Sequence, residues 1–178
     1  MERGIVVVPG SRLGPYEPLL CYAWLAARAR GAETLHVVWT ESRPAEGAAA
    51  WVAGQVGLAL DAFPVQRPVI VGKSLGSHAA TLAADRNLAG IWLTPLLTDQ
   101  GFVAALRRAR SPYMLVGGTA DALWDGELAR QLTPHVIEIP DADHGLIITG
   151  QPLAHSAAVL GRVVTAIEAF LDRDVWPS

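Results

Sequence analysis

The segment "PVIVGKSLGSHAA", residues 68–80, decides how this chain folds. An apolar, β-branched run leads into Gly72-Lys73-Ser74-Leu75-Gly76, and a run of small, helix-forming residues follows. This order is typical of a buried strand, a tight turn and a helix. Two motifs overlap in the turn. Gly-Lys-Ser ends a phosphate-binding loop, whereas Gly-x-Ser-x-Gly is a nucleophile elbow.

The residues that precede the turn do not match the phosphate-binding motif. It requires a glycine five positions before Gly72, and Arg67 occupies that position. Residues 68–71 have the composition of the strand itself, so they cannot form the loop that wraps a phosphate. We therefore expect no nucleotide to bind at Gly72-Lys73-Ser74.

The elbow motif fits every position of the turn. Its serine occupies a strained backbone conformation between strand and helix. Side chains two residues before and after Ser74 would collide there, and Gly72 and Gly76 have none. The Leu75 N–H, at the start of the helix, is placed to face a developing oxyanion.

The rest of the chain alternates between apolar strand patterns and longer helical patterns. We predict strands at residues 4–10 with the turn included, 34–40, 68–73, 88–95, 113–118 and 135–140. Helices are predicted at residues 17–30, 45–60, 75–86, 99–110, 125–132 and 153–172. Strands that are apolar on both faces and separated by helices indicate a parallel sheet covered on both sides. The predicted fold is a single α/β domain over residues 1–178, a three-layer α/β/α sandwich with a mostly parallel sheet of about six strands.

Composition excludes several classes of protein. The chain has 178 residues, a formal charge of −3 and no long run of either sign, which argues against nucleic acid or an anionic membrane as the main partner. Cys21 is the only cysteine, so no internal disulfide forms. The first residues do not resemble a secretory signal, and no segment approaches the about 20 apolar residues that span a bilayer. We expect a cytoplasmic protein.

Polar residues follow two later strands in the order typical of one large family. Gly118-Thr119-Ala120-Asp121 comes directly after the fifth predicted strand, and His144 follows the sixth. Together with the elbow, these residues resemble the α/β-hydrolase family, which orders its triad as serine, acid and histidine. The resemblance spans roughly residues 4–171. It is closest to the small, lidless members that resemble dienelactone hydrolase, although those commonly carry cysteine where this chain has Ser74.

The resemblance implies a role for each of these residues. Ser74 would be the nucleophile, His144 the base and Asp121 the acid that orients the base. N–H groups of Leu75 and Ser11 would form the oxyanion hole. Asp125 stays open as the alternative acid, although it also stands where it can cap the helix predicted near residue 126.

Other residues near the strand ends are candidates for binding. Gly10, Leu96 and Trp124 are expected to line the substrate site. Lys73 is expected to form a structural ion pair with Asp99 or Glu41, and the alternative is that it reaches toward a substrate carboxylate. Only residues 94–101 separate the fourth strand from the next helix, so no lid domain is expected over the site.

The sequence therefore predicts a small serine hydrolase that cleaves an ester or thioester through an acyl group on Ser74. Its partner would be a small acyl substrate, and no cofactor is implied. Asp141, Asp143 and His144 resemble metal ligands, but no distant ligand accompanies them, so no metal is expected. Two alternatives remain: a non-catalytic binding or scaffold protein on the same fold, and an amide or peptide hydrolase with the same triad.

Overall fold

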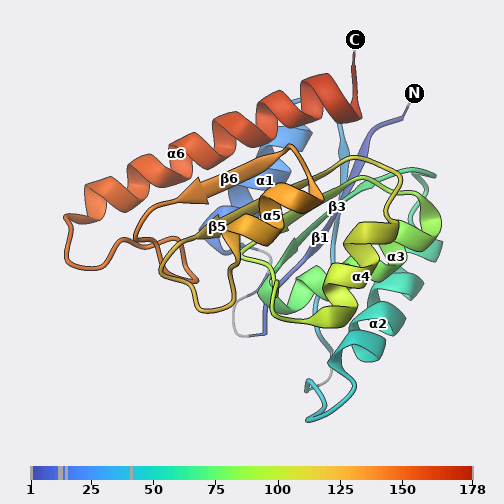
Figure 1. Ribbon diagram of the computed structural model, residues 1–178. Helices are drawn as coiled ribbons and strands as arrows, with labels where there is room; N and C mark the ends of the chain where they lie inside the picture. Colours follow the sequence, from blue (N-terminus) through green and yellow to red (C-terminus); the bar gives the residue numbers. More distant parts are fainter. Residues whose placement is uncertain (1, 12–13, 15, 41, 178) are drawn as a thin grey trace.

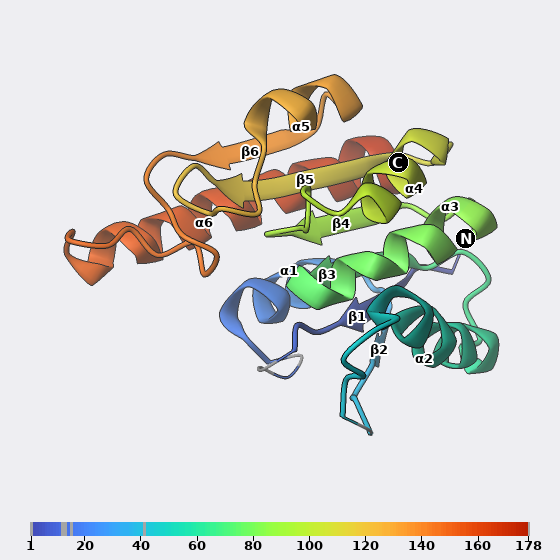
Figure 2. The ribbon, with the colours of Figure 1, turned by 60° about the horizontal axis from the view of Figure 1, so that its bottom comes forward.

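The computed structural model describes residues 2–11, 14, 16–40 and 42–177. Its centre is one parallel sheet of six strands in the order β2-β1-β3-β4-β5-β6. The strands are β1 (Gly4–Val8), β2 (Glu33–His36), β3 (Val69–Lys73), β4 (Gly90–Leu93), β5 (Tyr113–Gly118) and β6 (Val136–Ile139). Figure 2 shows the strands side by side with helices on both faces. The predicted fold class is confirmed.

Helices cover both faces of the sheet, as Figure 1 shows. They are α1 (Pro18–Arg28), α2 (Ala48–Ala62), the 3₁₀ helix η1 (Ser74–Ala79), α3 (Ala80–Arg86), α4 (Gln100–Arg108), α5 (Gly126–Leu132), α6 (Leu153–Phe170) and the π-helical turn η2 (Leu171–Val175). Buried side chains of α1 and α6 pack on one face of the sheet. Those of α2, η1, α3, α4 and α5 pack on the other.

The alternation of side chains along a strand supplies both layers of the core. Ile5 and Val7 of β1 contact the cluster beneath α1 and α6, whereas Val6 and Val8 contact the cluster beneath α2 and α3. All four side chains are completely buried. Because successive residues of a strand point to opposite faces, a strand covered on both sides is apolar at every position.

Some element boundaries differ from those that the sequence predicts. The helix expected from residue 75 begins as a 3₁₀ turn, and its α-helical part starts at Ala80. The strand expected over 88–95 ends at Leu93 because Thr94 has a φ of 40° and leaves the extended conformation. The strand expected over 34–40 ends at His36, opposite Val7, where its pairing with β1 stops.

The expectation that no segment is long and apolar enough to span a bilayer is wrong for the C-terminal helix. The helix Leu153–Val175 reaches that length, and an 18-residue window within it has a mean hydropathy of 1.3. α6 continues into η2 without a break, and alanine and valine dominate its sequence. α6 packs Val163 and Ile167 against the sheet, and 28% of the window is buried.

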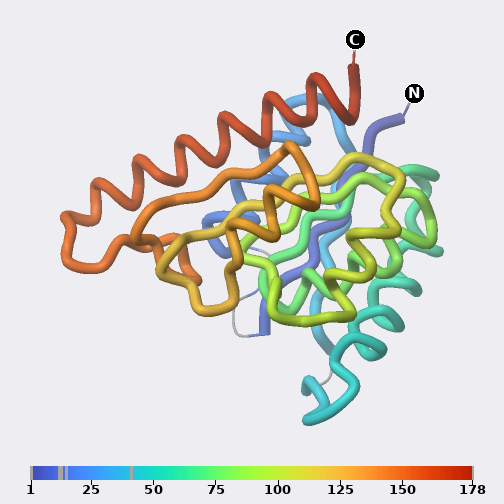
Figure 3. Tube along the Cα trace, in the orientation of Figure 1, coloured from blue at the N-terminus to red at the C-terminus, as the bar shows by residue number. Residues whose placement is uncertain are grey.

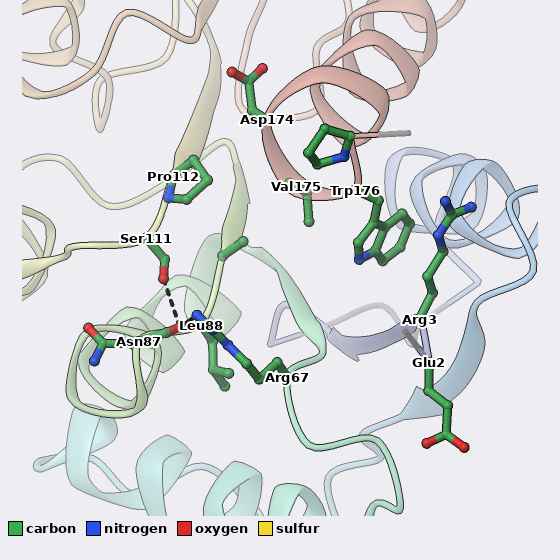
Figure 4. Close-up of a pocket in the computed structure, with 12 residues that line it drawn as sticks. Glu2, Arg3, Arg67, Asn87, Leu88, Ser111, Pro112, Asp174, Val175 and Trp176 are labelled. Atoms are coloured by element: carbon green, nitrogen blue, oxygen red, sulfur yellow. Dashed lines mark hydrogen bonds between the residues drawn. The ribbon is translucent and has the colours of Figure 1, made fainter.

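Both chain ends lie at the amino ends of the strands, as the trace in Figure 3 shows. Arg3 packs there on the ring of Trp176, 5.6 Å from its centroid. A cavity of about 470 Å³ opens beside them, and Figure 4 shows its lining, with Ser111 hydrogen-bonded to the Asn87 carbonyl. Parallel sheets place ligands at the carboxyl ends of their strands, so the functional site is expected at the opposite edge.

Candidate active site

The turn after β3 holds Ser74 in a conformation that few residues adopt. Ser74 has a φ of 52° and is the first residue of η1, directly after the end of β3. A Cβ on Gly72 would lie 2.5 Å from the Gly76 carbonyl oxygen, and one on Gly76 would overlap the carbonyl groups of Val8 and Pro9. Because residues 69–73 are strand rather than loop, they cannot wrap a phosphate. The backbone is that of an elbow, not of a phosphate-binding loop.

We expect Gly76→Ala to lower the free energy of unfolding by about 3 kcal/mol, the upper end of the usual cost of overpacking. The added methyl group would meet backbone on a neighbouring strand, which cannot move aside as a side chain can. Urea denaturation measures the effect. Gly161→Ala is the matched control, because Gly161 lies in α6 with no atom near its missing Cβ. The control should gain about 0.5–1 kcal/mol from helix propensity, and equal losses in both variants would contradict the explanation.

Ser77 fixes the elbow from within, a role that the sequence analysis did not assign. Its hydroxyl donates to the Ser74 carbonyl oxygen at 2.6 Å and accepts from the Leu96 N–H at 3.4 Å. The side chain is completely buried. A serine three residues after the nucleophile matches the common bond from a hydroxyl to the carbonyl at i−3, which is the signal that could have identified it.

A chain of two hydrogen bonds joins residues from three strand ends. The Ser74 Oγ lies 2.8 Å from His144 Nε2, and His144 Nδ1 lies 2.7 Å from Asp121 Oδ2. Ser74 follows β3, Asp121 follows β5 and His144 follows β6. The structure thus brings together the three residues that the sequence analysis proposed as a triad.

The charges along this chain fix the proton positions. An ionised carboxylate only accepts hydrogen bonds, so His144 Nδ1–H donates to Asp121 and the neutral ring has a free acceptor at Nε2. The Ser74 hydroxyl therefore donates to Nε2. In this tautomer His144 is ready to remove the proton of Ser74, as a general base must be.

Asp121 is held rigidly, whereas Asp125, the alternative acid, caps a helix. The Asp121 side chain is only 3% exposed, and its Oδ1 accepts from the Leu123 N–H at 3.0 Å. Asp125 caps α5 instead, because its Oδ1 accepts from the Leu128 N–H at 2.9 Å. A buried carboxylate with its second oxygen bonded to backbone keeps the orientation that a histidine partner needs.

The loop that carries His144 is also tied by hydrogen bonds. Asp143 Oδ1 accepts from the N–H groups of Gly145 at 2.8 Å and Ile147 at 3.0 Å. The Asp143 carboxylate therefore shapes the turn behind His144. In the part of the chain that the structure describes, no group of three His, Cys, Asp or Glu side chains could hold a metal ion.

The other histidines lie outside the hydrogen-bonded chain. His36 stacks on Tyr16, and burial lowers the pKa of its ring. Burial also lowers the pKa of His78, against the opposing effect of the Asp99 charge. His135 packs against Phe170. His144 is the histidine whose ring contacts Ser74 among the described residues.

A cavity of about 210 Å³ opens beside the Ser74 hydroxyl. Its lining residues come from the loop after β1, from the start of α1, from the elbow and from the histidine loop: Gly10, Ser11, Glu17, Leu20, Lys73, Ser74, His144 and Gly145. Gly10, expected at the substrate site, lies against the nucleophile, since a Cβ there would be 3.7 Å from Ser74 Cβ.

Two of the residues expected at the substrate site are not in this lining. Trp124 turns its indole toward β6, where Nε1–H donates to Glu138 Oε2 at 2.7 Å. Leu96 donates its backbone N–H to Ser77 and supports the elbow from the β4 side. Both follow strand ends, but their side chains or backbone groups are bonded to other elements, so neither borders the cavity.

The ion pair expected for Lys73 with Asp99 does not form. Asp99 caps α4, where its Oδ1 accepts from the Phe102 N–H at 2.7 Å. Lys73 lines the cavity, and its Nζ donates to the His144 carbonyl oxygen at 3.4 Å. Glu41, the other proposed partner, lies outside the described residues.

Glu17 lines the same cavity and was not identified from the sequence. It precedes α1, and its Oε2 is buried without a hydrogen-bond partner among the described residues. Burial raises the pKa of the Glu17 carboxyl, and the positive charge of Lys73 opposes that rise. Nothing local in "GPYEPLL" distinguishes this glutamate from an exposed helix-capping residue.

We expect Glu17→Gln to stabilise the protein at about pH 8 but not at about pH 4, near the ordinary carboxyl pKa. Because folding raises the pKa of Glu17, the folded state binds more protons than the unfolded state just above the ordinary value. Wild-type stability therefore falls as pH rises through that window, and glutamine has no such penalty. Urea unfolding at both pH values measures the change. Glu127→Gln, at an exposed residue in the first turn of α5, is the control, and an equal shift in both variants would refute the expectation.

Comparison with known proteins gives the fold. No protein-family model and no curated protein matches the sequence. A lidless α/β serine hydrolase from Xanthomonas campestris is 18% identical with a TM-score of 0.66, over 99% of this chain and 83% of that one. A dienelactone hydrolase from Anabaena variabilis is 20% identical with a TM-score of 0.72, over 97% and 87%. An esterase from Pyrococcus furiosus is 14% identical with a TM-score of 0.64, over 98% and 84%.

The likeness extends over nearly the whole chain. At identities this low it shows the fold, which is that of the lidless α/β hydrolases. The connection where a lid would be inserted is short, because only residues 94–99 join β4 to α4.

Proposed function

We propose that this chain, built on the α/β-hydrolase fold, is a serine hydrolase that cleaves a small ester or thioester. The observation that carries the proposal is the continuous hydrogen-bonded chain from Ser74 through His144 to buried Asp121. A serine hydroxyl is a weak nucleophile at neutral pH, and this arrangement is the one that activates it. The adjoining cavity and the hydrolases and esterases among similar structures agree with it.

In the first half of the reaction, Ser74 Oγ attacks the carbonyl carbon of the substrate and its proton moves to His144 Nε2. Asp121 stabilises the imidazolium that forms. The oxyanion of the tetrahedral intermediate is held by the N–H groups of Leu75 and Ser11. His144 then gives its proton to the departing alcohol or thiol, which leaves an acyl ester on Ser74.

In the second half, water enters where the leaving group was. His144 removes a proton from this water as it attacks the acyl carbon. The second tetrahedral intermediate collapses, the carboxylic acid leaves, and the proton returns to Ser74. No step needs a group beyond the substrate, water and the side chains named. The site has no lid and a small cavity, which favours short acyl groups over long chains.

A fluorophosphonate probe tests the proposal directly. We expect the intact mass of the wild-type protein to increase by one phosphonyl adduct, and the Ser74→Ala protein to stay unlabelled. A folded wild-type protein that takes no adduct would indicate a non-catalytic protein on a hydrolase fold.

A further inference from the structure

The cavity beside Ser74 contains two charges of opposite sign that do not neutralise each other by direct contact. Lys73 and Glu17 both line it, together with Ser74 and His144. The ion pairs among the described residues do not include a Lys73–Glu17 pair. The charges nevertheless act on each other, since the Lys73 charge lowers the pKa of the Glu17 carboxyl against the larger effect of burial. A space therefore separates an ammonium group from a carboxyl group next to the nucleophile.

Lys73 has unused hydrogen-bonding capacity in this space. Its side chain is buried, with the residue only 9% exposed, and an ammonium group carries three donors. The one acceptor that it reaches among the described residues is the His144 carbonyl oxygen, at a long 3.4 Å. A buried ammonium group with free donors is costly unless something else accepts from them.

Glu17 has the complementary deficit. Its Oε2 is shielded from solvent and accepts no hydrogen bond from the described residues. It comes from the start of α1, which packs against β1 and β3, so its place beside the elbow is set by the packing of the helix on the sheet. Lys73 and Glu17 thus bring an ammonium group and a carboxyl group to the lining of one cavity.

Charge decides which substituent of a substrate fits between them. A substrate carboxylate would be attracted by the charge of Lys73 and repelled by that of Glu17. A substrate amine would be attracted by Glu17 and repelled by Lys73. An alkyl group would accept nothing from the free donors of Lys73 and donate nothing to Glu17. A group that accepts from Lys73 and donates to Glu17 satisfies both, and a hydroxyl is the smallest such group. The volume of about 210 Å³, below the range of pockets for drug-sized ligands, also favours a small substituent.

We infer that Lys73 and Glu17 select a short-chain substrate that carries a hydroxyl group near its scissile ester or thioester bond. The inference rests on the proposed hydrolase function and names the substrate class of the same site. Lys73 and Glu17 would be specificity-determining residues, distinct from the groups that perform the chemistry. The hydroxyl can belong to the acyl part or to the alcohol part of the substrate.

Matched substrates test this selectivity. On the acyl side, kcat/KM is compared for 4-nitrophenyl esters of 3-hydroxybutanoate, 3-methylbutanoate and succinate. On the alcohol side, the pair is 2-hydroxyethyl acetate and propyl acetate. A site that hydrogen-bonds a substrate hydroxyl discriminates strongly against the analogue without it, so we expect a preference of at least roughly thirty-fold for the hydroxylated member on one side.

Variants assign the preference to the two residues. The ratio of interest is kcat/KM for the hydroxylated substrate divided by kcat/KM for its alkyl analogue. Lys73→Met and Glu17→Gln should each reduce this ratio to below about one third of its wild-type value. The double variant Glu17→Leu/Lys73→Met should favour the alkyl member. Glu127→Gln, which changes an exposed carboxylate in the first turn of another helix, should leave the ratio unchanged. Phosphonate labelling of each variant checks that its site is intact.

The ratio of kcat/KM values distinguishes recognition of the substrate hydroxyl by Lys73 from mere positioning of the His144 loop by Lys73. If Lys73 served only to hold the His144 loop through its bond to the carbonyl oxygen, Lys73→Met would slow both members equally and leave the ratio unchanged. That result would overturn the inference, as would a wild-type ratio near one on both sides or a preference for succinate. In all three cases hydrolysis itself and phosphonate labelling would persist, so the proposed function would survive. Absence of both labelling and turnover in the wild type would reject the function and the inference together.

Discussion

Replacing Ser74 with alanine is expected to lower kcat on an activated ester by about six orders of magnitude, the loss found when a triad serine is removed. Ser74 supplies the atom that forms the acyl intermediate, and its Oγ lies 2.8 Å from His144 Nε2. No other described side chain stands in this position. Burst kinetics with a 4-nitrophenyl ester measure the effect, because acylation releases one equivalent of phenol before steady turnover begins.

The matched control for this variant is Thr165→Ala. Thr165 is an exposed residue of α6 whose hydroxyl donates to the Gly161 carbonyl oxygen. Thr165→Ala also removes a hydroxyl group, and Thr165 is not among the residues that line the cavity. Turnover in the control should equal that of the wild type. If Ser74→Ala keeps more than about one hundredth of the wild-type kcat and still takes a phosphonate adduct, another residue is the nucleophile.

Asp121→Asn is expected to lower kcat by about four orders of magnitude while the protein stays folded. An asparagine can present its NH₂ group to His144, which favours the tautomer whose Nε2 carries a proton and cannot accept one from Ser74. The 2.7 Å contact between His144 Nδ1 and Asp121 Oδ2 is the interaction that would be reversed. Steady-state kcat, with circular dichroism as the folding check, measures the loss.

Asp125→Ala provides the contrast, because Asp125 is the other carboxylate in the same loop. It caps α5 through the Leu128 N–H and makes no contact with His144 in the structure. Loss of such a cap should cost about 1 kcal/mol of unfolding free energy and leave kcat nearly unchanged. If Asp125→Ala were inactive and Asp121→Asn active, the acid of the triad would be Asp125 and not Asp121.

The sheet could be predicted from the sequence because its strands are short and separated by helices, and the four central strands β1, β3, β4 and β5 are buried at every position. These features are local, and right-handed crossovers between parallel strands then leave few possible arrangements. The elbow could also be predicted from the sequence. A side chain on Gly72 would meet the Gly76 carbonyl group, and one on Gly76 would meet the backbone at the end of β1, so both glycines are required by the geometry of the turn.

The positions of Ser74, Asp121 and His144 could be anticipated for a related reason. Each follows a strand directly, and the carboxyl ends of parallel strands meet at one edge of a sheet. The argument fails for residues whose side chains can turn in more than one direction. Trp124 also follows a strand end, but its indole packs over Gly117 and bonds to Glu138. Position along the chain does not determine that orientation.

Local sequence patterns thus predict the order of the elements, the elbow and the three strand ends that carry Ser74, Asp121 and His144. That Glu17 and Lys73 line one cavity beside the nucleophile is visible only in the folded chain. Strand and turn patterns follow from backbone sterics and the period of side-chain burial, which act between near neighbours. The meeting of a helix-start carboxyl group with a strand-end ammonium group depends on how α1 packs across the sheet, and that packing depends on the whole core.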